Sequence, residues 1–245
     1  KNHFFATPEK RLEWLKVLYQ NDPKIIICDY EIKQNVSSSS YKSMVYLYQK
    51  YQFKQKPYFI IGADNLKGLK NWYNFKQLNT MVKWMVSTRD NISIPDGFHL
   101  LKIKKNISST QIREKLSLNY LPLTVANDIQ RFYKMQKRID AITAVLDKNK
   151  GENIEVFDLR DKDYLVDYAI IATTIGAKHS EALLNYMKTD LKPKGEEFGD
   201  VESDDEWIVV DLGDIFVHLM SQSYRDKYQL DDFMNEIKTR IIPTY

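Results

Sequence analysis

An uninterrupted apolar run, Tyr58–Gly62 (YFIIG), constrains the fold more than any other feature of this chain. A strand that is apolar at every position, rather than at alternate positions, is typical of a parallel sheet with both faces covered. Similar runs predict strands at 24–29, 84–88 and 100–104, and helices are predicted at 8–20, 43–51, 64–72 and 108–116. Strands that alternate with helices indicate an α/β fold with a parallel, doubly wound sheet.

The second half of the chain predicts a small mixed α/β domain. An amphipathic helix over 123–147 precedes strands at 154–159, 168–173, 207–212 and 215–220, a helix at 177–191 and a polar, acidic loop at 192–206. Met135 would be a natural start for an independent protein. We therefore place the junction at about residue 134, inside one long or kinked helix, which gives domains 1–134 and 135–245.

The net charge of +3 conceals an asymmetry between these two domains. Residues 1–134 hold 22 Lys and Arg against 10 Asp and Glu, a net charge of +12, whereas residues 135–245 hold 14 against 23, a net charge of −9. A basic domain suits phosphate-bearing ligands or nucleic acid, and an acidic domain suits a basic protein surface. The alternative is that the charge only keeps each domain soluble.

Composition also excludes some classes of protein. No apolar run approaches the roughly 18 residues that a membrane-spanning helix needs, and residues 1–14 are too charged for a signal peptide. Cys28 is the single cysteine, so neither an internal disulfide nor a paired-cysteine site can form. We expect a cytoplasmic protein with no membrane partner, no metal site and no tightly bound cofactor.

The first candidate site follows the apolar strand, at the carboxyl edge where open α/β sheets place their ligands. Gly62 lets a ligand approach the backbone, and Asp64 can accept hydrogen bonds from ribose hydroxyls or an amide. Trp72 offers a flat face to an aromatic ring such as a pyridine. The alternatives are an ordinary turn at Gly62-Ala63-Asp64 and a core position for Trp72.

A second segment, 107–113 (ISSTQIR), predicts a phosphate site. Ser108, Ser109 and Thr110 stand at a predicted helix start, beside unpaired backbone N–H groups and the positive end of the helix. Arg113, one turn further in, adds positive charge. The alternative is an ordinary helix cap with an exposed arginine.

In this order and spacing, residues 1–134 resemble the nicotinate-mononucleotide adenylyltransferase family. The segments that carry the resemblance are PEKRLEWL, KIIICDYEI, FIIGADNLKGLKNWYNFKQL and ISSTQIREKL. The resemblance implies a Rossmann-like nucleotidyltransferase that transfers AMP from ATP, bound with Mg²⁺, to nicotinate mononucleotide. It implies that Gly62, Asp64, Trp72 and Arg89 hold the nicotinate nucleotide, and that Ser108, Ser109, Thr110 and Arg113 hold the ATP phosphates.

One departure from the family pattern concerns catalysis. The family carries an HxGH motif after its first strand, and nothing in this sequence matches it; the histidines, His3, His99, His179 and His218, occur singly. Losing those donors to the transferred phosphate lowers the rate by orders of magnitude. We therefore assign no catalytic residue, and we expect a sheet that lacks its first strand. A fragment of a longer protein is favoured over a degenerate enzyme because the other ligand motifs are intact.

The acidic domain offers a recognition surface rather than an active site. Residues 206–218 predict a two-stranded hairpin whose tight turn includes Gly213. Carboxylates at strand ends and turns are usually caps or solvated groups. His218, in an apolar strand, is expected to be a hydrogen-bonded core residue and not a ligand.

This half resembles the ribosome silencing factor family, also called Iojap-like, over about 135–240, through NIEVFDLRDKDYLVDYAIIATTIGAKHSEAL, EWIVVDLGDIFVHLM and YRDKYQLDDF. The resemblance implies binding to large-subunit ribosomal protein uL14, which blocks subunit joining. The expected contact residues are Trp207, Asp211, Leu212, Asp214, Tyr224, Arg225 and Tyr228. For Trp207 the alternative is a core position beneath the hairpin.

The two halves together predict a bifunctional protein of NAD biosynthesis and translation repression. Its expected partners are nicotinate mononucleotide, ATP and the large ribosomal subunit, with a homodimer as a further expectation. The alternative is a purely ribosome-binding regulator with a vestigial nucleotide scaffold. Nucleic-acid binding by the basic domain is a second alternative, and it would show an affinity that falls steeply with salt.

Overall fold

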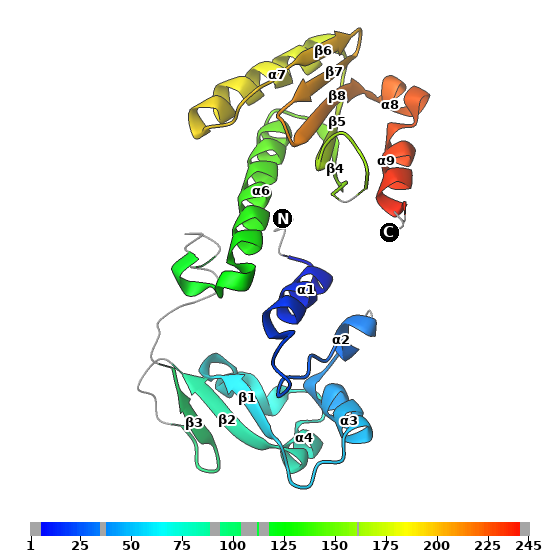
Figure 1. Ribbon diagram of the computed structural model, residues 1–245. Coiled ribbons are helices and arrows are strands. Elements are labelled where there is room, and N and C mark those ends of the chain that lie inside the picture. The colour runs from blue at the N-terminus through cyan, green and yellow to red at the C-terminus, as the bar shows by residue number, and fades with distance from the viewer. Residues whose placement is uncertain are drawn as a thin grey trace. The chain divides into compact units, whose positions relative to one another are not determined.

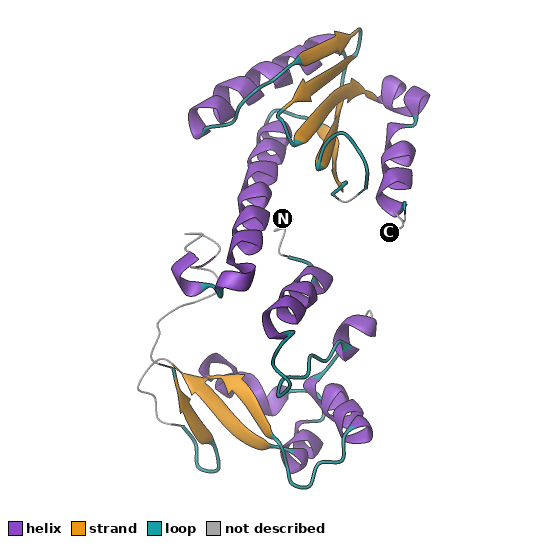
Figure 2. Cartoon of the chain, in the orientation of Figure 1, coloured by secondary structure: helices purple, strands orange, loops and turns teal. Residues whose placement is uncertain are grey.

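The computed structural model describes residues 6–34, 38–88, 94–103, 112, 118–160 and 162–240. Contacts along the chain divide it into two compact units, Lys1–Arg131 and Phe132–Tyr245. Figures 1 and 2 show the elements of each unit. The boundary falls within a single helix, α6 (Leu123–Lys148).

The first unit contains a three-stranded parallel sheet, which confirms the predicted α/β class. Its strands are β1 (Tyr58–Gly62), β2 (Lys83–Thr88) and β3 (His99–Lys102), in the order β1-β2-β3. The helices are α1 (Pro8–Tyr19), α2 (Tyr30–Lys33), α3 (Ser40–Lys50), α4 (Phe75–Met81) and the 3-10 helices η1 (Ala63–Asn71) and η2 (Leu118–Tyr120). Thr7 caps α1 by accepting a hydrogen bond from the Lys10 N–H at 3.2 Å.

One face of this sheet carries the core of the unit. Met44 of α3, Leu69 of η1 and Leu78 of α4 pack against Ile61 and Trp84 of the strands. The Trp84 indole N–H donates to Asn79 at 2.8 Å, which satisfies the buried donor. Helices therefore pack on the face of the sheet that carries Ile61 and Trp84, whereas Tyr58 and Ile60 of β1 are exposed.

Two expectations for this unit are wrong. Residues 24–29 form no strand, and Ile26 is 68% exposed. β-Branched residues favour a strand only where a neighbouring strand completes the ladder, and no described strand pairs with this segment. β1 is also less buried than its sequence indicated, because Tyr58 and Ile60 are 51% and 57% exposed and only Ile61 is buried.

The second unit contains a mixed five-stranded sheet with the order β4-β5-β8-β7-β6. β5 and β8 are parallel, and the other neighbours are antiparallel. The strands are β4 (Glu152–Asp158), β5 (Tyr168–Thr174), β6 (Val201–Asp204), β7 (Trp207–Asp211) and β8 (Ile215–Ser221). Its helices after α6 are α7 (Ala177–Leu191), η3 (Lys192–Lys194), α8 (Gln222–Tyr228) and α9 (Leu230–Thr239).

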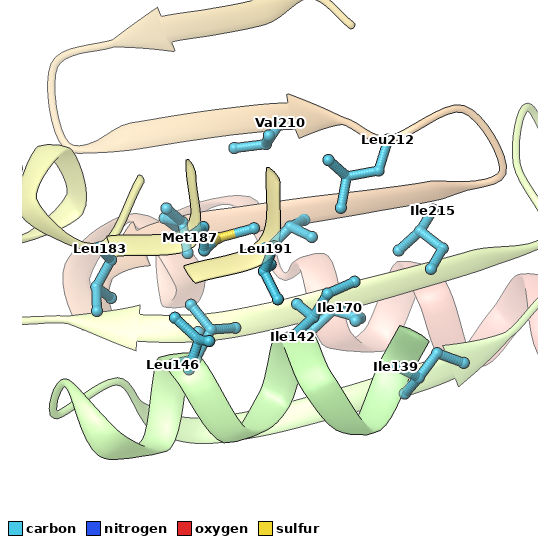
Figure 3. Packing of buried hydrophobic residues seen from close by; sticks show 14 of the residues in the cluster. Ile139, Ile142, Leu146, Ile170, Leu183, Met187, Leu191, Val210, Leu212 and Ile215 are labelled. Atoms are coloured by element: carbon cyan, nitrogen blue, oxygen red, sulfur yellow. The ribbon is translucent and has the colours of Figure 1, made fainter. Parts of the chain in front are cut away.

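Helices cover this sheet on both faces. On one face, side chains of α6 and α7 pack against those of the strands (Figure 3), with Ile142, Leu146 and Met187 wholly buried in the same cluster as Ile170 of β5. On the other face, α9 packs over β4 and β5. Every residue of β5 is buried, because its alternate side chains enter the two cores.

The predicted acidic loop at 192–206 is partly wrong, because it contains η3 and the edge strand β6. β6 carries Glu202 and Asp204, which are exposed on an edge that pairs only with β7 among the described strands. Charged residues are common on edge strands because they oppose pairing with other chains. Local composition therefore concealed a strand that only its neighbour stabilises.

Candidate functional site

The carboxyl end of β1 is shaped by Gly62 and Asp64. β1 ends at Gly62, and Asp64 lies in the first turn of η1 with its carboxylate exposed. A Cβ atom at position 62 would lie 2.3 Å from Oδ1 of Asp64, which in turn accepts a hydrogen bond from the Asn65 amide at 3.3 Å. The absence of a side chain at Gly62 therefore lets Asp64 fold over the strand end.

Trp72 directly follows η1 and joins the rim of the core. Its ring lies edge-on to Phe59, with centroids 6.5 Å apart, and edge-on to Trp84 at 6.3 Å. Trp72 is half-buried, so packing fixes its ring while part of it remains accessible. Both interpretations of this residue, core packing and an aromatic platform, are compatible with that position.

The remaining nucleotide-site residues lie outside the described part of the chain. They are Arg89, Ser108, Ser109, Thr110 and Arg113. Their roles stay predictions from the sequence. The structure thus places Gly62, Asp64 and Trp72 along one short segment, from the end of β1 to the end of η1.

Trp207, Tyr224 and Tyr228 come together in the second unit. The Trp207 ring lies 5.2 Å from that of Tyr228, which lies 5.7 Å from Tyr224. The Lys227 ammonium lies over both tyrosine rings, at 5.4 and 4.9 Å. We call these three aromatic residues the aromatic strip. It joins the start of β7 to α8 and brings together three of the residues expected to form one contact region.

Acidic residues border the aromatic strip. The Tyr224 hydroxyl donates to Asp205 at 3.1 Å, and the Ser223 hydroxyl donates to Glu206 at 3.4 Å. Asp205, Glu206, Tyr224 and Ala177 line an open hollow. Asp205 and Glu206 were not among the expected contact residues, although they are the last two residues of the acidic segment 192–206. Two carboxylates directly before Trp207 were the sequence feature that could have added them to the expected contact region.

The other end of the hairpin is held by Arg138 of α6. Its guanidinium donates to Glu196 at 2.6 and 3.1 Å, to Asp214 at 2.5 Å and to the Leu212 carbonyl at 3.0 Å. Hydrogen bonds to Glu196 and Asp214 raise the pKa of Arg138. Asp211 accepts the Gly213 N–H at 2.6 Å, and Gly213 has φ +87°, as the predicted tight turn requires.

Two of the expected contact residues are not accessible. Arg225 is 4% exposed; its guanidinium donates twice to Asp231 at 2.6 Å, and also to Thr173 at 2.9 Å. Leu212 is likewise 4% exposed and belongs to the core under α6 and α7. The expectation that these two residues contact a partner is wrong, because internal hydrogen bonds hold Arg225 and core packing holds Leu212 inside the unit.

His218 is buried beside the aromatic strip, as expected. Its Nδ1 accepts the Trp207 indole N–H at 3.3 Å, whereas its Nε2 is buried without a hydrogen-bond partner among the described residues. Burial lowers the pKa of His218 to about 4. The ring is therefore neutral at physiological pH, and it orients Trp207.

No described helix is long and apolar enough to span a membrane. Within the described ranges, no three His, Cys, Asp or Glu side chains gather closely enough to hold a metal ion.

Comparison with known proteins gives two separate matches along the chain. A protein of Sulfurimonas denitrificans named probable nicotinate-nucleotide adenylyltransferase is 37% identical over 134 residues, which are 55% of this chain and 72% of that protein. A Campylobacter fetus protein of the same name is 40% identical over 134 residues, 55% of this chain and 74% of its own. The chain belongs to the nicotinate-nucleotide adenylyltransferase family.

The chain also matches the cytidylyltransferase-like family over its residues 1–115. Residues 133–243 match the family described as ribosomal silencing factor during starvation. Both resemblances inferred from the sequence are thereby confirmed. A crystal structure of a protein from Chromobacterium violaceum aligns with 45% of this adenylyltransferase-family chain and 90% of its own, at 27% identity and a TM-score of 0.39.

Proposed function

We propose that the first unit binds nicotinate mononucleotide and ATP for adenylyl transfer. In that reaction a phosphate oxygen of the mononucleotide attacks the α-phosphorus of ATP, and the bond to the leaving pyrophosphate breaks. Asp64 would accept hydrogen bonds from the nicotinate nucleotide and Trp72 would flank its ring, while 107–113 and Arg89 would bind phosphates. Magnesium would enter with ATP.

The observation that carries this proposal is the strand end at Gly62. Open α/β sheets bind ligands at the carboxyl ends of their strands, and Asp64 is exposed there with its carboxylate over a glycine. The relatives named probable nicotinate-nucleotide adenylyltransferases support the choice of ligands. Because no HxGH motif occurs in this sequence, the test concerns ligand binding rather than turnover.

Isothermal titration of the Asp64→Ala variant tests the assignment. We expect the affinity for nicotinate mononucleotide to fall about tenfold or more, since a hydrogen bond to a charged group contributes about 1.5–3 kcal/mol, while the affinity for ATP changes little. Asp96→Ala is the matched control, because Asp96 is another exposed carboxylate of the same unit. Equal losses of affinity for nicotinate mononucleotide and ATP would reject the assignment. If the unaltered protein binds neither ligand, the result would favour a vestigial scaffold.

We propose that the second unit binds the large ribosomal subunit through the basic protein uL14 and so blocks subunit joining. The aromatic strip would form the centre of this contact, with Asp205 and Glu206 at its border. Asp211 and Asp214 would extend the contact along the hairpin, about 13 Å from Trp207 by the rise of a strand. The net charge of −9 over residues 135–245 favours a basic protein and opposes contact with bare RNA.

The observation that carries this second proposal is the placement of Trp207. Trp207 is half-buried, and contacts with His218 and Tyr228 hold its ring in place. Rigid aromatic residues with a polar border are typical of binding hot spots. The match of residues 133–243 to the ribosomal silencing factor family supports the ribosome as the target.

Co-sedimentation with large ribosomal subunits tests this contact. We expect Trp207→Ala to weaken binding by at least thirtyfold, since hot-spot residues contribute about 2 kcal/mol or more, and Trp207→Phe to retain part of it. Tyr186→Ala is the control, because Tyr186 is a 48% exposed aromatic residue of α7 in the same unit. Unchanged sedimentation of a folded Trp207→Ala protein would end the proposal.

A further inference from the structure

The amino edge of the parallel sheet carries an aromatic and cationic surface that the proposed nucleotide site does not use. We define this amino-edge surface as residues 50–58 together with Lys83. We propose that the amino-edge surface binds single-stranded nucleic acid, with the phosphates on its lysines and the bases on its exposed rings.

Lysine ammonium groups and aromatic rings alternate on this surface. Lys50 Nζ lies 5.5 Å from the ring centroid of Tyr51, and Lys83 Nζ lies 5.5 Å from that of Tyr58. Tyr58 is 51% exposed and Phe53 is 38% exposed, so each offers part of a ring to a partner. Sequence-tolerant sites for single strands combine such stacking rings with a cationic path for the backbone.

Local contacts hold these residues in place. The Tyr48 hydroxyl donates to the Met81 carbonyl at 2.6 Å, and the Lys83 N–H donates to the Pro57 carbonyl at 2.9 Å. These bonds tie the end of α3 and the start of β1 to the start of β2. The connection that carries Lys54 and Lys56 is therefore held at both of its ends, near Tyr48 and at Pro57.

The sequence around this surface is rich in lysine. Between Glu31 and Asp64 it contains no acidic residue, whereas Lys42, Lys50, Lys54 and Lys56 fall in this interval together with Lys33, whose ammonium pairs with Asp29 at 3.0 Å. A region of one sign attracts polyanions and speeds their association. Single strands are favoured over duplexes because the exposed rings need unpaired bases to stack on.

The amino-edge surface is distinct from the nucleotide site. β1 and β2 are parallel and in register from Tyr58 and Lys83 to Gly62 and Ser87. The amino-edge surface therefore lies where the strands begin, and Asp64 follows the end at which β1 stops. A single strand on the amino-edge surface and nucleotides at the carboxyl end of β1 should therefore bind at the same time.

Fluorescence anisotropy with a labelled 12-nucleotide oligouridylate tests the inference on the full chain. We expect the logarithm of the association constant to fall linearly with the logarithm of the salt concentration. The slope should be about −3 if four lysines each neutralise one phosphate, namely Lys50, Lys54, Lys56 and Lys83. Replacing these four lysines by Gln should flatten the slope and remove binding at 200 mM KCl. Replacing Lys178, Lys188, Lys194 and Lys238 by Gln removes the same total charge from the second unit, and it should leave binding within about threefold.

A second variant separates stacking from charge. Tyr58→Ala should weaken binding about tenfold at an unchanged salt slope, and Tyr58→Phe should restore it, since a ring contributes stacking whatever its hydroxyl does. Circular dichroism and urea denaturation report that each variant remains folded. Any of four results would overturn the inference: no binding, equal affinity for a duplex of the same length, displacement of the oligouridylate by ATP, or the same lysine dependence on phosphatidylserine vesicles.

Discussion

At the scale of single residues, Gly62 positions Asp64 because it has no side chain and so leaves room for the Asp64 carboxylate. The backbone of Gly62 has φ −70°, which any residue adopts, so the glycine is not required by backbone geometry. It is required because a Cβ atom would meet Oδ1 of Asp64 at 2.3 Å. The contact would displace a flexible, exposed side chain, and stability and binding should therefore respond differently.

We predict that Gly62→Ala lowers the affinity for nicotinate mononucleotide about tenfold while the free energy of unfolding changes by less than about 1 kcal/mol. The substitution moves the Asp64 carboxylate, but it also restricts the unfolded chain, which is worth about 0.4–1 kcal/mol. Calorimetric titration and urea denaturation measure the two quantities. Gly68→Ala is the control, since nothing lies within 4 Å of a Cβ there; a fall in stability without a loss of affinity would contradict the argument.

His218 makes a second residue-scale prediction, which concerns pH. Burial lowers its folded-state pKa to about 4, whereas an unfolded histidine titrates near 6.5. Because its folded-state pKa is depressed, His218 binds a proton more readily in the unfolded chain than in the folded protein. Its protonation therefore leaves the free energy of unfolding unchanged above about pH 6.5 and lowers it as the pH falls toward 4. The loss at pH 4.5 should be about 2–3 kcal/mol.

Hydrogen exchange of the β8 amides, corrected for intrinsic rates, measures this loss. His218→Asn keeps an acceptor for the Trp207 indole but does not titrate. Between pH 7 and 4.5 the free energy of unfolding of this variant should therefore fall by about 2–3 kcal/mol less than that of the unaltered protein. Equal pH dependence in both proteins would show that His218 is not the group responsible.

At the scale of elements, the hairpin of β7 and β8 depends on a side chain from a distant helix. Arg138 of α6 joins Glu196, Asp214 and the Leu212 carbonyl. The Glu196 side chain is only 8% exposed. Removing the arginine would leave a nearly buried carboxylate without its partner, and such an uncompensated charge is strongly unfavourable.

We predict that Arg138→Met destabilises the second unit by about 2–4 kcal/mol, somewhat below the value for a fully buried pair because the Arg138 side chain is 30% exposed. Adding Glu196→Gln should recover part of the loss, since the remaining amide carries no charge. Urea denaturation compares the single and double variants, with Lys134→Met on the same helix as the control. A double variant no more stable than Arg138→Met would refute the charge argument.

Element prediction succeeded where local pattern and tertiary partner agree. β5 and β8 lie close to their predicted bounds, because their apolar runs are buried on one or both faces. The 24–29 segment has an equally apolar run, but no described strand pairs with it. β6 shows the converse: its acidic sequence opposes a strand, yet β7 pairs with it over four residue pairs.

At the scale of the whole molecule, two units with opposite charge share the helix α6. The second unit has its own cores on both faces of its sheet. Ile139, Ile142 and Leu146 of α6 are almost fully buried in one of them. The helix is therefore part of the second unit's core although its first turns belong to the first unit.

We predict that a fragment of residues 123–245 folds cooperatively by itself, with a melting temperature within about 3 °C of the second-unit transition of the full chain. A fragment of residues 150–245 should not fold, because it lacks five buried apolar side chains of α6, namely Met135, Ile139, Ile142, Val145 and Leu146. Their loss forfeits about 1.5–3 kcal/mol each, which is most of the stability of a small domain. Scanning calorimetry measures both. A 123–245 fragment that melts only together with the first unit would show that the two units are not independent.

The sequence by itself determined the division into two modules, their families, the strand-helix alternation and the glycine at the end of β1. These depend on local periodicity, on charge and on motifs that lie close together along the chain. Only the tertiary structure decided that Arg225 and Leu212 are buried, that Trp207 meets Tyr228, and that lysines and rings share the amino edge of the sheet. Those facts depend on which side chains meet across distant segments, and packing, not local pattern, determines that.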